Sequence, residues 1–283
     1  MSATRRCGSG SVRAASGKVY QLCLLDTNAL SEIVKHPTVE GRGFVQRFPP
    51  SEWVPCWTVY NLVELRRSSR AYQPWLSFFG VYPSFLLKPE NQILDDEIAN
   101  YDTPEQVCVQ LNAFSPAGRD CAHHLGEFID GFFSDPRTQK IEKRFPTRIE
   151  AMLEEWLSRK AAFSPRNEAA NAVDADRYVD EVGAVELCLS RREWVQSMLR
   201  KKQAPDIARL PSLHTVLYSQ YYRLFDGGWS PRAAEVTDVL IAAAAPYMDA
   251  VVTERFQAGI FRKIRGRVRG MDATQIYSLA DLR

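Results

Sequence analysis

This sequence lacks several features that mark secreted, zinc-binding or membrane proteins. Its 283 residues include six cysteines and four histidines. They contain no Cys-x-x-Cys pair, so neither a disulfide framework nor a zinc site is predicted. The longest apolar run, VLIAAAAPYM at 239–248, is too short to span a bilayer. No secretory apolar segment lies near the start. These absences predict a cytoplasmic protein without membrane contacts.

A large excess of charge of either sign is also missing. The formal net charge is +2, which argues against a chain that binds nucleic acid over its whole surface. Any basic surface is therefore local. The clearest candidate is RKIRGRVR at 262–269. A solvated charged face and a phosphate-binding surface both explain such a run, and the sequence does not choose between them.

Short apolar runs alternate with helical patterns at both ends of the chain. VYQLCLL at 19–25 predicts a buried strand, and residues 28–35 have helical spacing. The stretch at 53–71 starts as a strand and becomes helical after Thr58, a good N-cap residue. Towards the end, a helix is predicted to about 245, with strands at 249–253 and 273–279. This alternation predicts a three-layer α/β/α core with a central parallel sheet.

The middle of the chain breaks this alternation. From about 85 to 225, helical patterns are separated by proline-containing turns, and no strand of comparable strength is predicted. We therefore predict a large helical insertion in the core. The expected segments are a disordered tail (1–18), the first part of the core (19–84), the helical insertion (85–212) and the second part of the core (213–283).

Acidic residues fall at the strand ends and on the helices that leave them. They are Asp26, Glu64, Asp238, Asp249 and Glu254. The carboxyl ends of parallel strands share one edge of a sheet, so these carboxylates are expected to meet. Carboxylates held close together need a cation, and all-oxygen ligation suits Mg²⁺ or Mn²⁺. Such a site favours phosphodiester hydrolysis, in which the metal activates water without a Ser, Cys or His nucleophile.

The pieces LLDTNALSE, NLVEL and DVLIAAAAPYMDAVVTE resemble a PIN-domain (PilT N-terminus-like) ribonuclease. The similarity covers about 19–71 and 215–283. It places the family's four acids at Asp26, Glu64, Asp238 and, after a Val-Thr pair, Glu254. Many members carry the fourth acid two residues after the threonine, where this chain has Arg255. The choice between Glu254 and Asp249 as the fourth ligand therefore stays open.

The resemblance implies a divalent-metal-dependent endoribonuclease with Mg²⁺ or Mn²⁺ as cofactor. The polar side chains of Thr27 and Asn28 would support the first acid or contact the scissile phosphate. The implied partners are an RNA substrate, an antitoxin or other regulatory protein, and a second copy of the chain. The candidate RNA contacts are Arg255, Arg262, Lys263, Arg265 and Arg267.

Two other functions are compatible with parts of the pattern. The shifted fourth acid and the large insertion motivate a PIN-like module that binds RNA or protein without cleaving it. A phosphatase of the haloacid dehalogenase type also starts with an aspartate after a strand. That chemistry needs a second aspartate two residues later, where this chain has Asn28, so it ranks last.

Overall fold

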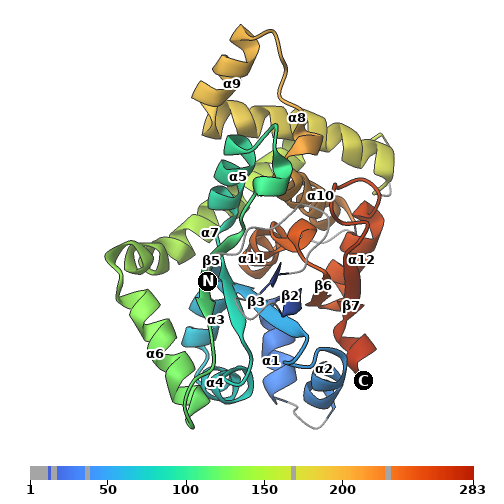
Figure 1. The fold of residues 1–283 in the computed structure, drawn as a ribbon. Helices are drawn as coiled ribbons and strands as arrows, with labels where there is room; N and C mark the ends of the chain where they lie inside the picture. The colour runs from blue at the N-terminus through green and yellow to red at the C-terminus, as the bar shows by residue number, and fades with distance from the viewer. Residues whose placement is uncertain (1–11, 14–17, 36–38, 167–169, 227–230) are drawn as a thin grey trace.

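The computed structural model describes residues 12–13, 18–35, 39–166, 170–226 and 231–283. Six strands form one sheet in the order β5-β4-β3-β2-β6-β7 (Figure 1). Neighbouring strands are parallel except for the β4–β5 pair. Their bounds are β2 (Val19–Leu25), β3 (Trp53–Thr58), β4 (Ser84–Leu87), β5 (Gln110–Phe114), β6 (Ala250–Thr253) and β7 (Gln275–Ser278).

The predicted strands at 19–25, 53–58, 249–253 and 273–279 therefore exist and share this sheet. β2 and β3 lie at its centre, and their apolar side chains are buried on both faces, from Leu22 to Leu25 and throughout Trp53–Thr58. Continuous burial of this kind is typical of parallel strands covered on both sides. The central position of β2 places the end of this strand in the interior of the molecule.

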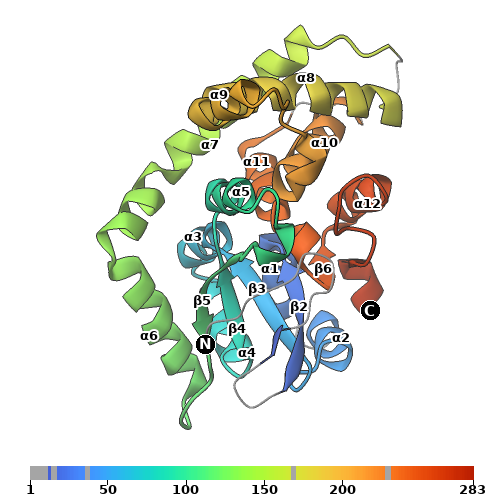
Figure 2. The same cartoon turned by 45° about the horizontal axis from the view of Figure 1, so that its top comes forward.

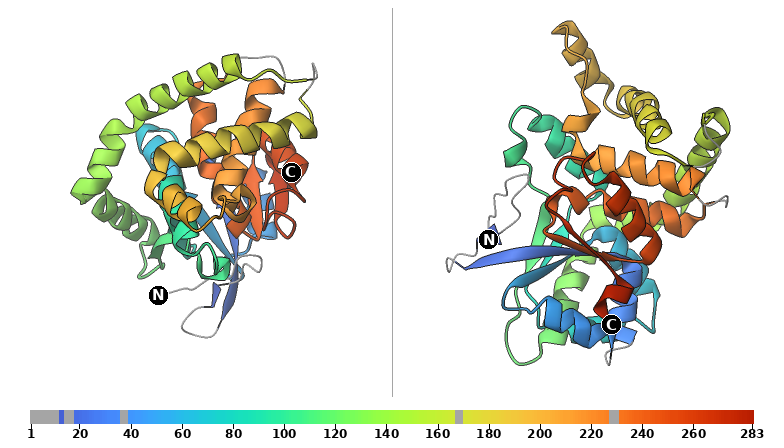
Figure 3. Two further views of the ribbon diagram at one scale, coloured as in Figure 1. Left: turned by 90° about the horizontal axis from the view of Figure 1, so that it is seen from above. Right: turned by 90° about the vertical axis from the view of Figure 1, so that its right-hand side faces the viewer.

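Helices cover both faces of the sheet, which confirms the predicted three-layer architecture (Figures 1 and 3). One face carries α1 (Thr27–Lys35), α2 (Glu40–Arg47) and α4 (Tyr72–Phe79), and the other carries α5 (Glu90–Ala99), α10 (Pro211–Phe225) and α12 (Arg255–Ile264). α3 (Val59–Arg67) and α11 (Ala233–Ala242) contact each other. Thr58 caps α3 as expected, because its hydroxyl accepts the backbone N–H of Asn61.

A helical segment, α6 to α10, interrupts the core. α6 (Cys121–Ser134), α7 (Pro136–Ala162) and α8 (Ala172–Ser190) curve around one side of the molecule (Figure 2), followed by α9 (Arg192–Arg200). The last of the five helices, α10, packs against α8 and also against α11 and α12 of the core. The inserted segment is thus joined to the core along α10, and also where α6 packs against α4 and α7 against α11.

The stretch 85–225, where no strand of comparable strength is predicted, does contain strands, because β5 occupies Gln110–Phe114 and most of β4 lies there too. β5 is a half-exposed antiparallel edge strand with the sequence QLNAF. Such a strand has no continuous apolar run, so its sequence carries little signal. The sheet therefore extends further along the chain than the predicted boundary at residue 84.

Two further expectations concern the amino-terminal tail and the membrane. Within the predicted tail, Val12 and Arg13 form β1, which pairs antiparallel with β2; most of the rest lies outside the described residues. None of the helices in the described ranges is long and apolar enough to cross a membrane.

Candidate active site

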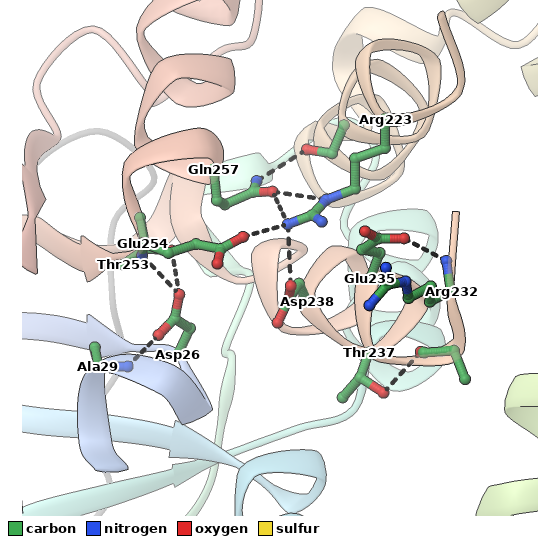
Figure 4. Close-up of polar contacts among 12 residues, drawn as sticks. Asp26, Ala29, Arg223, Arg232, Glu235, Thr237, Asp238, Thr253, Glu254 and Gln257 are labelled. Atoms are coloured by element: carbon green, nitrogen blue, oxygen red, sulfur yellow. Dashed lines mark hydrogen bonds and ion pairs between the residues drawn. The ribbon is translucent and has the colours of Figure 1, made fainter. Parts of the chain in front are cut away.

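Four of the five predicted acids come together at the carboxyl edge of the sheet. Asp26 follows β2, and Glu254 follows β6. The parallel register pairs Leu25 with Val252, so Asp26 lies beside the end of β6. Glu64 reaches this edge from α3 and Asp238 from α11. Figure 4 shows Asp26, Asp238 and Glu254 approaching one another from three different elements.

Asp26 is held by hydrogen bonds on both carboxylate oxygens. The backbone N–H of Ala29 donates to Oδ1 at 2.6 Å. The hydroxyl of Thr253 and the backbone N–H of Glu254, at 3.1 Å, donate to Oδ2. Burial raises the pKa of Asp26, and these hydrogen bonds oppose that rise. The Ala29 bond also caps the start of α1, so Asp26 serves both as a helix cap and as a site residue.

Two threonines lie close to the Glu64 carboxyl. The neighbouring hydroxyls of Thr27 and Thr237 act to lower its pKa. Burial is the main cause of its raised pKa, and the charge of Asp26 raises the pKa further. Thr27 was predicted to support the first acid, but its hydroxyl lies beside Glu64 and accepts a hydrogen bond from Asn61 Nδ2 at 3.0 Å. Asn28, the other predicted supporting residue, has an exposed side chain.

Asp238 is the acid whose titration is most perturbed. Burial raises the pKa of Asp238 to about 8, even though Arg223 opposes the rise. The charges of Asp26, Glu254 and Glu64 each raise this pKa further. Asp238 thus interacts electrostatically with each of the other three acids. Like charges collected in a buried place are expected to need a cation.

Arg223, on α10, supplies one cation to this cluster. Its Nη2 lies 3.0 Å from Asp238 Oδ2 and 3.5 Å from Glu254 Oε1. Gln257 Oε1 accepts from Nη2 at 2.8 Å and from Nε at 3.1 Å. The guanidinium side chain is only 1% exposed. A segment that contributes no acid to the cluster therefore places a fixed positive charge between two of its members (Figure 4).

The other predicted site residues lie elsewhere. Asp249 is at the opposite end of β6, where its Oδ2 accepts the backbone N–H of Leu22 at 2.6 Å. It therefore does not join the cluster, and Glu254 is the fourth acid by position. Among the predicted RNA contacts, Arg262, Lys263 and Arg267 form ion pairs with Asp281, Asp226 and Asp176, and Arg265 donates to the Asp272 carbonyl. Arg255 is exposed directly after Glu254.

The donor chemistry of the cluster fits Mg²⁺ or Mn²⁺, because it offers only hard carboxylate oxygens. As the side chains stand, no group of three or more His, Cys, Asp or Glu residues within the described ranges is arranged to hold a metal ion. The acids instead face their hydrogen-bond donors and Arg223. An ion would be held by Asp26, by Glu64 and by Asp238, of which only Oδ2 contacts Arg223.

Four residues that organise the cluster were not singled out from the sequence as site residues. They are Arg223, Thr237, Thr253 and Gln257. Thr253 was noticed only as part of the Val-Thr pair at a strand end. Arg223 lies within LYSQYYRLF, an aromatic stretch that reads as core packing. A single arginine on an otherwise buried helix was the available signal, since buried arginines normally have an acidic partner.

Comparisons with protein-family models, with curated proteins and with solved structures found no match for this chain.

Proposed function

We propose that this protein is a PIN-like, divalent-metal-dependent ribonuclease whose active site is the acid cluster at the carboxyl edge of the sheet. The observation that carries the proposal is the convergence of Asp26, Glu64, Asp238 and Glu254, three of which have a pKa raised by burial and by one another. Burial and mutual repulsion of ionised carboxylates destabilise the folded protein, so a cluster of this kind is expected to serve a function that depends on a bound cation.

A divalent cation bound there would supply the charge that activates water and stabilises a phosphoryl group during hydrolysis. The residues of the chain would hold the ion and orient the substrate. Thr253 and the backbone of Glu254 fix Asp26, and Thr27 and Thr237 lie beside Glu64. Arg255, exposed beside the cluster, is the best placed of the predicted basic residues to contact an RNA phosphate, because the other four are engaged with carboxylates or a carbonyl.

The proposal is tested by cleavage of labelled single-stranded and structured RNA with Mg²⁺, Mn²⁺ or EDTA. We expect metal-dependent cleavage that is lost in both Asp26→Asn and Asp238→Asn. Asp249→Asn is the matched control, because Asp249 directly precedes β6 and therefore lies at the opposite edge of the sheet from the acid cluster. Cleavage that persists in EDTA, or that survives both cluster variants, would contradict the proposal.

A second candidate function is a PIN-like module that binds RNA or protein without cleaving it. It is favoured by the position of Arg223, which already neutralises part of the charge on Asp238 and Glu254. RNA bound with unchanged affinity in the presence of EDTA, without cleavage and without measurable Mn²⁺ binding, would support this candidate and rule out the nuclease.

A further inference from the structure

The acid cluster contains a permanent cation of its own, and this limits how many metal ions it can hold. We propose that the guanidinium of Arg223 takes the place of a second metal ion, an inference that rests on the proposed function. The site would then bind a single divalent cation through Asp26, Glu64 and Asp238. Glu254 would be held by Arg223 and would not ligate the ion.

The contacts of Nη2 define the place that the guanidinium fills. This nitrogen lies between Asp238 Oδ2 and Glu254 Oε1, at 3.0 and 3.5 Å. A metal ion bound to both Asp238 Oδ2 and Glu254 Oε1 would compete with Nη2 for that place, since Mg²⁺–oxygen distances are only about 2.0–2.1 Å. A second ion and this guanidinium would therefore compete for the same two oxygen atoms. A single ion need not compete, because Asp238 Oδ1 is not used by Arg223.

The guanidinium is fixed in this place. Gln257 Oε1 accepts from both Nε and Nη2, and Gln257 Nε2 in turn donates to Ser219 Oγ at 3.4 Å, which sets the orientation of the amide. Ser219 lies on α10, one turn before Arg223, so the helix supports its own arginine. An arginine stays protonated at every physiological pH. The positive charge therefore cannot leave the cluster by losing a proton.

One donor of Arg223 remains available. Its Nη1 is buried and has no hydrogen-bond partner within the described part of the chain. A buried guanidinium nitrogen normally has a partner. A donor left open beside an acid cluster suits an anionic oxygen, such as a phosphoryl oxygen of the substrate. The guanidinium would then link two of the acids to the phosphate, as a second metal ion does in a two-metal site.

The experiment is a titration of the metal-free full chain with Mn²⁺, with bound ion counted by equilibrium dialysis and by electron paramagnetic resonance. The wild type is expected to bind one Mn²⁺ in the cluster. Arg223→Met removes the charge but keeps an unbranched apolar side chain, and it is expected to bind two. Arg223→Lys, which keeps a cation near the acids, is the matched control and is expected to bind one.

Glu254→Gln keeps the test decisive if Arg223→Met does not fold, because Glu254 is partly exposed at the start of α12. We expect this variant to change the Mn²⁺ affinity less than about tenfold, whereas loss of a metal ligand or its support costs about 10–100-fold. The inference about Arg223 would be overturned, with the proposed function left intact, by any of three results: two ions in the wild type, one ion in folded Arg223→Met, or a larger loss of affinity in Glu254→Gln. Absence of Mn²⁺ binding by the wild type would overturn the proposed function as well.

Discussion

Asp238→Asn is expected to stabilise the metal-free protein at neutral pH, although it removes one side of an ion pair. In the folded protein, burial raises the pKa of Asp238 from its ordinary 3.8 to about 8. A carboxyl whose pKa is raised on folding makes its full contribution to the free energy of unfolding at pH values below its pKa in the unfolded chain. That stability is lost as the pH rises from about 4 towards 8, because the unfolded chain ionises the group freely and the folded chain does not.

The magnitude follows from the two pKa values. At neutral pH the difference from the unfolded pKa is about 3 units, and each unit corresponds to 1.36 kcal/mol, so the free energy of unfolding falls by about 4 kcal/mol through this residue. Asparagine is neutral at every pH and its carbonyl still accepts a hydrogen bond from Arg223. Asp238→Asn should therefore remove most of this fall.

The assay is urea unfolding of the EDTA-treated wild type and variant at about pH 4.5 and about pH 7.5. Asp180→Asn, at an exposed position on α8, is the control for loss of a carboxylate. We expect Asp238→Asn to gain stability over the wild type only at the higher pH. A variant that is less stable than the wild type at both pH values would refute the reasoning, since the Arg223 ion pair would then outweigh burial and repulsion.

Three further predictions follow from other contacts. Burial raises the pKa of Glu97 to about 7, so the wild type should lose about 3 kcal/mol of unfolding free energy through this residue as the pH rises from about 4.5 to above 7. Glu97→Gln should abolish that loss. An unchanged pH profile in urea unfolding would contradict this. Thr253→Val removes a hydrogen bond to Asp26 and should weaken Mn²⁺ binding about 10–100-fold; equal affinity in a Mn²⁺ titration would argue against that role. Arg255→Ala should lower RNA affinity and reduce the slope of log K against log salt by about 1. Arg262→Ala should change both quantities less, because Arg262 is ion-paired with Asp281. Equal effects of the two variants would contradict the role of Arg255 as a phosphate contact.

The core of the fold could be predicted because its central strands are buried on both faces. Runs such as VYQLCLL and WVPCWT show this burial directly in their composition. β5 could not be found in the same way, because an exposed antiparallel edge strand needs neither alternation nor a long apolar run. The sheet therefore contains a strand that the sequence pattern does not predict.

The candidate site could likewise be predicted only in part. The positions of Asp26, Glu64, Asp238 and Glu254 at strand ends and on adjoining helices were enough to predict that they lie near one another. The contacts of Arg223 and Gln257 were not predictable, because they depend on how α10 packs against α11 and α12. Asp249 illustrates the same limit: it is four residues before Thr253, and a strand of this length carries it to the other edge of the sheet.

An anomalous diffraction map of crystals of the full chain soaked in Mn²⁺ would show directly where the ion binds. We predict a strong peak at the carboxyl edge of the sheet, within ligating distance of Asp26 and Asp238 and weakened in crystals of Asp26→Asn. A peak at another place, or none in crystals of a chain that binds Mn²⁺ in solution, would show that the acid cluster is not the metal centre.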